Sequence, residues 1–368
     1  MTGLKEVEVV STGVYLPGNP IPFDELESVL GKFEQAPPAV KRMEGKLRSL
    51  AKGLIGVESV YYAIDPQTGR FTENNTTMAA KAIRQALDRA GLAAGEVDCL
   101  LYGNALPDMQ TPPTSTLIQE ELGIEKCAEM ELHSNCSAIS KLLQIAQDSI
   151  RLGRYRNVVV AYSQMSSVYL RASYYNQEKV GTESFLLRWF LSDAASAIVL
   201  KARDKVEQGL KLEFVDNQSI GGKKKPGMWL NLGTRNFDLP EAYRTGDHHF
   251  CQDYRTTNDI GPACFYEAFE RLIDRSGLQY ADVDHVLATL PSKKLWEYGK
   301  LTFDQKYGVT ADKWFGNADK LGYAGASSVI IALDEALKSG RFKRGQRLSA
   351  VVFESSKWMI GGFIIKYV

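Results

Sequence analysis

The sequence has no cysteine pair at the spacing that zinc sites or disulfide frameworks use. It has five cysteines, an odd number, and no CxxC motif. The cysteines are Cys99, Cys127, Cys136, Cys251 and Cys264. This distribution argues against a structural zinc site and against a disulfide-stapled secreted domain, and it favours a reducing cytoplasm. We therefore expect a cytoplasmic protein that uses neither a metal nor a cofactor.

An excess of one charge and a long apolar run are also missing. The chain has 44 Lys and Arg residues against 44 Asp and Glu residues, so no global field directs it toward nucleic acid. No stretch is long and apolar enough to span a bilayer, and the N-terminus lacks the pattern of a signal peptide. With 368 residues, the chain is long enough for one large domain or for two fused halves.

One cysteine, Cys136, stands where a short strand meets a long amphipathic helix. The segment 126–132 has strand-like alternation, and ISKLLQIAQDSIRLG follows with helical periodicity. Ser134 and Asn135 are N-cap residues, so we expect Cys136 in the first helical turn. A helix N-terminus favours a thiolate and offers free N–H groups to an oxyanion. The alternative is an inert, buried cysteine.

The chain repeats itself. AIRQALDRAGL, from Ala82, aligns with AFERLIDRSGL, from Ala268, and Gly153-Arg154 aligns with Gly340-Arg341 at nearly the same offset. Each copy reads as a helix, a glycine stop and an apolar strand, which is half of a βαβ unit. We infer an internally duplicated α/β protein with an N-terminal half over residues 1–204 and a C-terminal half over residues 205–368.

The same offset locates a candidate site. It carries Cys136 onto Tyr323, again at a predicted helix start, and it carries the strand end near Gly103 onto Thr289. Ligands of doubly wound sheets collect at the carboxyl ends of strands and at helix N-termini. If a pseudo-twofold axis relates the halves, Cys136, Tyr323 and Thr289 converge near it. Otherwise Tyr323 and Thr289 are capping and packing residues.

Several motifs resemble, in order and spacing, the β-ketoacyl-ACP synthase III branch of the thiolase superfamily. They are STGVYLPG, GLIGVESVYYAIDPQTG, GNALPDMQTPPTSTLIQEELG, HSNCSAISKLLQIAQDSIRLG and FLSDAASAIVL. The resemblance covers nearly the whole chain. It implies the thiolase-like fold, in which two duplicated βαβαβ halves form a five-layered αβαβα arrangement.

The resemblance also implies a mechanism. The family's cysteine takes an acyl group from CoA or acyl carrier protein, and its histidine and asparagine then stabilise an enolate. Cys136 carries over as the nucleophile, and its own N–H with one from the turn near Ser356 forms the oxyanion hole. Thr289 and Tyr323 stand at the histidine and asparagine positions, while His285 and Asn317 match other places. Acyl loading needs only a thiolate and an oxyanion hole. The changed positions therefore affect ordinary malonyl-dependent condensation, the step that uses the histidine and the asparagine.

Three functions remain open on the sequence alone. The first is an acyl-thioester transferase or condensing enzyme with a Cys/Thr/Tyr site, in fatty-acid-like, polyketide or other secondary-metabolite biosynthesis. The second is a catalytically impaired subunit paired with a complete ketosynthase, since the family dimerises through its central sheet, and the third is an acyl-binding scaffold. The expected partners are acyl-CoA or an acyl carrier protein, and a second ketosynthase-like chain in a homodimer or heterodimer.

Other residues allow two interpretations each. His248 and His249 are either a solvated loop pair or a replacement base over the pocket. Lys223–Lys225 is either a solvated run or a contact for a CoA phosphate or an acidic carrier helix. We expect Glu354 to shape a turn, and the aromatic segment 164–190 to roof the acyl pocket or to pack in the core.

Overall fold

The strands form two five-stranded halves with the same internal order. The computed structural model describes residues 3–368 except 289 and 291. When the five strands of each half are numbered along the chain, both halves have the spatial order 3-2-4-5-1. Strands β1 and β8 pair with each other and join the halves into one ten-stranded sheet. From one edge to the other, the strands are β12 (Trp314–Phe315), β11 (His285–Ala288), β13 (Arg347–Glu354), β14 (Met359–Tyr367), β8 (Leu210–Ser219), β1 (Glu6–Tyr15), β7 (Ala194–Arg203), β6 (Asn157–Gln164), β4 (Cys99–Asn104) and β5 (Ala128–His133).

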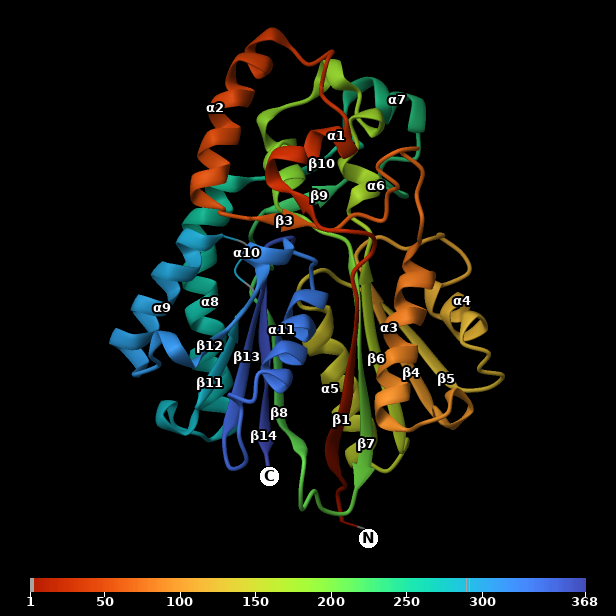
Figure 1. The fold of residues 1–368 in the computed structure, drawn as a ribbon, viewed down its shortest axis with the longest axis vertical. Coiled ribbons are helices and arrows are strands. Elements are labelled where there is room, and N and C mark those ends of the chain that lie inside the picture. Colours follow the sequence, from red (N-terminus) through yellow and green to blue (C-terminus); the bar gives the residue numbers. More distant parts are fainter. Residues whose placement is uncertain (1–2, 289, 291) are drawn as a thin grey trace.

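Helices complete a five-layered arrangement (Figure 1). Two helices lie between the halves, where their apolar sides share one core with strands of both: α5 (Ala138–Arg151) and α11 (Ser327–Lys338). The outer helices are α3 (Asn75–Ala90) and α4 (Thr114–Glu121) on the first half, and α8 (Tyr254–Ser276) and α9 (Lys293–Tyr307) on the second. The predicted duplicated thiolase-like fold is therefore confirmed.

The repeated sequence motif builds equivalent helices. Asn74 caps α3 and Asp253 caps α8, each by accepting a backbone N–H with its side chain. Gly91 and Gly277 then end these helices in the left-handed conformation that the motif predicts. The boundary proposed between residues 204 and 205 falls in the connection from β7 to β8.

A cap covers the end of the sheet at which β1, β6 and β8 finish and β7 and β14 begin (Figure 1). Its elements are α1 (Leu26–Leu30), α2 (Pro38–Leu54), α6 (Ser167–Leu170), α7 (Leu239–Thr245), β2 (Ile21–Pro22), β3 (Ser59–Val60), β9 (Met228–Leu230) and β10 (Phe250–Gln252), together with short 3-10 turns between residues 172 and 189. The segment 164–190 supplies much of its buried apolar cluster, which also contains Tyr323 and has Cys136 packed against it. The cap therefore covers the candidate nucleophile.

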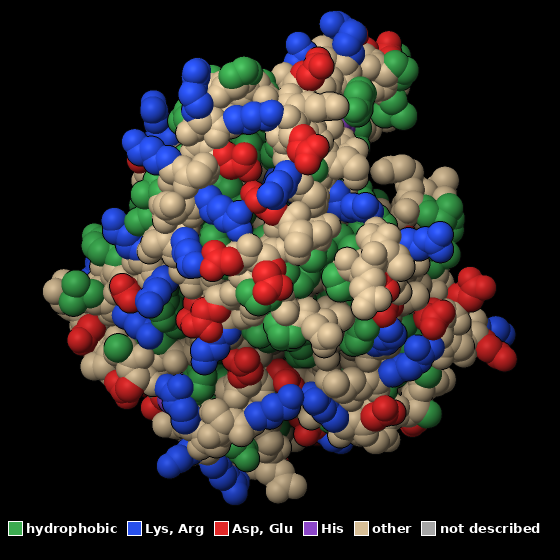
Figure 2. Space-filling view, turned by 45° about the horizontal axis from the view of Figure 1, so that its top comes forward, with side chains coloured by type: hydrophobic (Ala, Val, Ile, Leu, Met, Phe, Trp, Pro, Cys, Tyr) green, Lys and Arg blue, Asp and Glu red, His purple; other side chains and the backbone are tan. Residues whose placement is uncertain are grey.

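The surface has no dominant charge. Acidic and basic side chains are both spread over the face seen in Figure 2, in keeping with the equal totals of the sequence. In the described part of the chain, no helix has the length and apolar character that crossing a membrane requires.

Candidate active site

Cys136 lies in a turn rather than inside the helix. The edge strand β5 ends at His133, and α5 begins only at Ala138 with Ser137 as its N-cap. The Ala138 N–H donates to the carbonyl of Asn135 at 3.0 Å, which closes the turn around the cysteine. The prediction that Ser134 or Asn135 caps the helix is therefore wrong, because the chain makes this extra turn before α5 starts.

A buried carboxylate, Glu354, closes the start of α5. Its Oε2 accepts the Ser137 N–H at 3.0 Å, the Ser137 hydroxyl at 2.6 Å and the Ser134 hydroxyl at 3.1 Å. Its Oε1 accepts the hydroxyl of Ser356. Glu354 ends β13 in the second half, so one carboxylate connects the nucleophile turn to the β13–β14 turn (residues 355–358). The sequence pointed to a turn-shaping role for Glu354 but not to this contact across the halves.

Burial and the ionised Glu354 together make Cys136 a weakly acidic thiol. Burial raises the pKa of Glu354, but hydrogen bonds from Ser137 and Ser356 and the charge of Lys141 outweigh burial and leave that pKa below its usual value. Burial, and then the charge of Glu354, raise the pKa of Cys136 to about 12. The expectation of a thiolate is wrong, first because burial disfavours the charged sulfur and second because the Glu354 carboxylate takes up the N–H of Ser137 and opposes the positive helix end.

Tyr323 reaches the sulfur, as the duplication predicts. Its side chain makes a hydrogen bond with Cys136 that lowers the pKa of the thiol, although less than burial and Glu354 raise it. The backbone fixes this position, because the Tyr323 N–H donates to the Phe190 carbonyl at 2.7 Å and its own carbonyl accepts the Ser192 N–H at 2.9 Å. Gly322 precedes it at φ 69°, where a Cβ would lie 2.8 Å from Val60.

The other two predicted site residues are Thr289 and Ser356. Thr289 lies outside the described residues; β11 ends one residue before it, at Ala288. Ser356 lies in the β13–β14 turn, and its hydroxyl donates to Glu354. Its part in an oxyanion hole stays a prediction.

A lysine-rich loop, residues 221–226, supports the β13–β14 turn from behind. Trp358 ends the turn at φ 60°, a strained conformation for a bulky residue, and its side chain is fully buried. The Trp358 indole N–H donates to the Lys225 carbonyl at 2.6 Å, and the Ile220 N–H donates to the Trp358 carbonyl at 2.9 Å. The run Lys223–Lys225 therefore has a structural role that the sequence did not reveal.

His248 and His249 are buried in the cap and are not a solvated loop pair. The ring nitrogens of His248 each lie 3.0 Å from a backbone carbonyl, those of Ala242 and Tyr174. Burial, and next the charge of His248, lower the pKa of His249 to about 4. The carbonyls hold the His248 ring inside the cap, and the His249 ring packs against Tyr175 with 4.9 Å between centroids, so the structure does not favour their role as a replacement base.

Other polar groups surround the nucleophile. Burial, followed by the nearby Cys136 and Glu354, raises the pKa of Tyr162, whose hydroxyl lies 3.3 Å from Gln164 Oε1.

A small cavity of about 20 Å³ at the ends of β11 and β12 includes Asn317 but not Cys136. Among the described residues, no group of three His, Cys, Asp or Glu side chains could hold a metal ion.

Comparison with known proteins agrees with this architecture. The model for the 3-oxoacyl-[acyl-carrier-protein (ACP)] synthase III C terminal matches residues 273–366. The β-ketoacyl-[acyl-carrier-protein] synthase III of Neisseria meningitidis is 25% identical over 365 residues, covering 94% of each chain.

Two solved structures extend the likeness to the whole fold. AbyA1, a tetronic acid condensing enzyme, has a TM-score of 0.81 and 25% identity over 98% of this chain and 99% of its own. The 3-oxoacyl-[acyl-carrier-protein] synthase III of Aquifex aeolicus has a TM-score of 0.75 and 19% identity over 98% and 100%. The chain is thus similar in sequence to β-ketoacyl-ACP synthase III over nearly its whole length, and it has the same thiolase-like fold.

Proposed function

We propose that this chain is an acyl-thioester transferase or condensing enzyme that loads an acyl group from CoA or an acyl carrier protein onto Cys136. The observation that carries the proposal is the hydrogen bond between Cys136 and Tyr323 beneath the apolar cap. A reactive sulfur that adjoins apolar side chains and a phenol suits an acyl thioester, whose chain is apolar and whose carbonyl accepts hydrogen bonds.

In the loading step the Cys136 sulfur attacks the thioester carbonyl carbon. A new carbon–sulfur bond forms, the bond to the donor thiol breaks, and the proton of Cys136 leaves with the donor as its free thiol. Because burial and Glu354 keep Cys136 protonated at neutral pH, proton loss accompanies attack. Tyr323 stabilises the sulfur as it becomes negative, and the N–H groups of Cys136 and the turn at Ser356 receive the carbonyl oxygen.

The second half-reaction uses a non-standard Cys/Thr/Tyr site. Tyr323 and Thr289 offer hydroxyl donors in place of the family's asparagine and histidine, and neither is a general base near neutral pH. We propose that they orient the acceptor, in fatty-acid-like or polyketide biosynthesis. Loss of an oxyanion donor typically costs about 10²–10³-fold in rate, so loading should exceed malonyl-dependent condensation.

The test is acyl loading followed by intact mass. The chain is incubated with a series of acyl-CoA donors of increasing length, and we expect a mass increase equal to one acyl group. The increase should vanish in Cys136→Ala and persist in Cys127→Ala, which removes another partly accessible cysteine. No adduct with any CoA or carrier-protein donor would exclude the loading function and favour the impaired-subunit alternative.

We also propose that the chain pairs with a second ketosynthase-like chain through β5. This strand ends the ten-stranded sheet, pairs only with β4 within the described chain, and exposes Met130 at 39%. An open edge strand can add a second copy by backbone hydrogen bonds. Light scattering after gel filtration should give twice the chain mass, and Met130→Pro should reduce it; a monomeric native chain would contradict a homodimer.

A further inference from the structure

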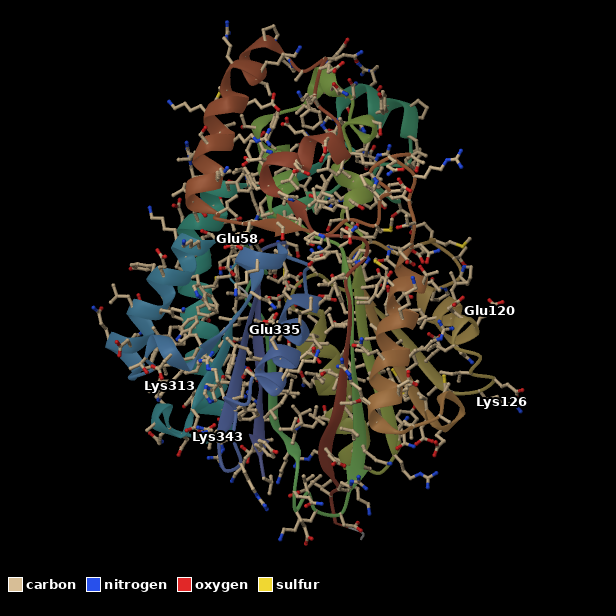
Figure 3. The ribbon with its side chains drawn as sticks, in the orientation of Figure 1. Glu58, Glu120, Lys126, Lys313, Glu335 and Lys343 are labelled. Carbon is tan, nitrogen blue, oxygen red and sulfur yellow. The ribbon has the colours of Figure 1, made fainter. Side chains whose placement is uncertain are left out.

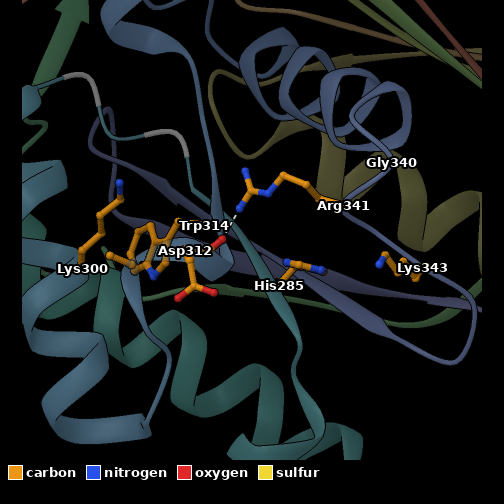
Figure 4. A pocket seen from close by; sticks show the side chains of 8 residues that line it. His285, Lys300, Asp312, Trp314, Gly340, Arg341 and Lys343 are labelled. Carbon is orange, nitrogen blue, oxygen red and sulfur yellow. Dashed lines mark hydrogen bonds between the residues drawn. The ribbon is translucent and has the colours of Figure 1, made fainter.

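A basic cleft opens beside the edge strand β12, in the C-terminal half. It encloses about 670 Å³, within the range of small-ligand sites, and its lining includes His285, Lys300, Asp312, Trp314, Arg341 and Lys343 (Figure 4). Lys300 comes from α9, His285 begins β11, and Arg341 and Lys343 follow α11. Two separate parts of the chain, α9 and the segment after α11, therefore bring cationic side chains to one hollow.

The cleft is separate from the nucleophile site. The helix α11 begins four residues after Tyr323 and ends just before Arg341, and its 12 residues extend about 18 Å. Figure 3 shows Lys343 together with Lys313 at the lower end of this half, away from Glu58 at the base of the cap. A ligand in this cleft therefore lies at the opposite end of α11 from Cys136.

Arg341 and Lys300 contact a backbone carbonyl and aromatic rings. Arg341 donates to the backbone carbonyl of Asp312 and lies 4.2 Å from the Phe315 ring centroid, while Lys300 lies over Trp296 at 4.9 Å. Within the described part of the chain, neither these two side chains nor Lys343 forms an ion pair. Three positive charges thus face a single acidic side chain of the lining, Asp312.

Burial dominates the electrostatics of Lys300. It lowers the pKa of Lys300; the charges of Asp319 and Glu297 oppose that shift, and the smaller effect of Arg341 adds to it. The floor is fixed, because the His285 ring nitrogens lie 3.3 Å from the Lys313 carbonyl and 3.2 Å from Gln346 Oε1. A bound anion would stabilise the charged form of Lys300 without rearranging this floor.

We propose that this cleft binds a phosphoryl group of a small phosphorylated molecule. A phosphoryl dianion is opposite in charge to Lys300, Arg341 and Lys343, which outnumber Asp312, the one acidic side chain of the lining. Its oxygens accept the planar N–H donors of arginine and the point charge of lysine together, an arrangement that proteins use widely for phosphate. The proposal is independent of acyl loading at Cys136.

The duplication supplies a matched control for the test. Arg341 follows Gly340 after α11, and Arg154 follows Gly153 after α5 at the equivalent place of the first half. Arg341→Gln and Arg154→Gln each remove one exposed positive charge at the end of a central helix, but only the first changes the cleft.

Calorimetric titration with pyrophosphate, at fixed moderate ionic strength, tests the proposal. We expect saturable binding to the native chain, a loss of about tenfold or more in affinity in Arg341→Gln, and a change of less than about twofold in Arg154→Gln. Lys343→Gln should also weaken binding, which guards against misfolding of one variant, and thermal unfolding midpoints without ligand should match. Cys136→Ala should bind pyrophosphate as the native chain does.

A parallel titration with CoA distinguishes two sources of the phosphoryl group. If CoA affinity also falls in Arg341→Gln, the donor's own phosphates occupy the cleft; if only pyrophosphate affinity falls, the ligand is a separate phosphorylated molecule. Absence of saturable pyrophosphate binding to the native chain overturns the proposal. Equal weakening in Arg341→Gln and Arg154→Gln also overturns it, because binding would then reflect diffuse surface charge.

Discussion

At the scale of single residues, the protonation of Cys136 controls its chemistry. With a pKa of about 12, the thiol is almost wholly protonated at neutral pH. Its thiolate fraction, and so its rate of alkylation by iodoacetamide, should rise about tenfold per pH unit over roughly pH 7–9 without reaching a plateau. Intact mass measures the rate, and Cys136→Ala identifies the signal. A rate that levels off below about pH 8 would contradict the raised pKa.

The phenol of Tyr323 lowers the pKa of Cys136 and so opposes the effects of burial and Glu354. Because its hydrogen bond lowers the pKa of Cys136, Tyr323→Phe should raise that pKa and slow alkylation and acyl loading about three- to tenfold at a fixed pH. Tyr298→Phe, on the exposed face of α9, removes a hydroxyl in solvent and should leave both rates unchanged. Equal rates for Tyr323→Phe and the native chain would show that the hydroxyl does not act on the sulfur.

The sequence identifies some of these residues and not others, for a physical reason. Tyr323 could be predicted at Cys136 because duplicated halves place equivalent helix starts near one axis. The role of Glu354 could not, because its contact with Ser137 joins residues 217 positions apart. The raised pKa of Cys136 follows from burial and then from the charge of Glu354, and both depend on the folded structure. Likewise, the local sequence around His248 and His249 does not indicate that the cap buries these residues.

At the scale of elements, the lysine loop (residues 221–226) supports the β13–β14 turn. Gly221 packs so closely that an added Cβ would lie 1.8 Å from the Lys357 carbonyl oxygen, whereas a Cβ at Gly222 meets nothing within 4 Å. Gly221→Ala should therefore displace the loop or the turn, lower the free energy of unfolding by about 1–3 kcal/mol and slow acyl loading.

The neighbouring glycine provides the control for this substitution. Gly222→Ala should change the free energy of unfolding by less than about 0.5 kcal/mol and leave loading intact. Urea unfolding of both variants gives the comparison. If the two variants behave alike, the loop does not support the turn.

Element boundaries were predictable where caps and glycine stops define them. Gly91 and Gly277 end α3 and α8 as the repeated motif indicates. The start of α5 was predicted too early, because Ser134 binds Glu354 from the other half and does not cap the helix. The helix α2 was not predicted, although its apolar residues recur with helical periodicity; only Ala51 is buried in it.

At the scale of the whole molecule, the two halves depend on shared buried contacts. Asp334 of α11, a second-half residue, accepts from the Thr12 hydroxyl and from Arg89, each at 2.7 Å, and both of these donors belong to the first half. Together with the pairing of β1 and β8, this contact fixes how the halves meet. The convergence of Cys136 and Tyr323 therefore requires both halves to be folded and docked.

We expect the chain to unfold in a single transition. The substitution Asp334→Asn should move that whole transition to a lower urea concentration. Loss of the charge leaves Arg89 and Lys338 without their carboxylate, at a cost of about 1–3 kcal/mol because both cations are partly exposed. Asp148→Asn, an exposed position on the equivalent helix α5, should cost less than about 0.5 kcal/mol. Near- and far-ultraviolet circular dichroism should give coincident curves in urea, since the halves share one sheet and one core. Two separate transitions in the native chain would mean that the halves are stable apart, and the site between them would then form only on docking.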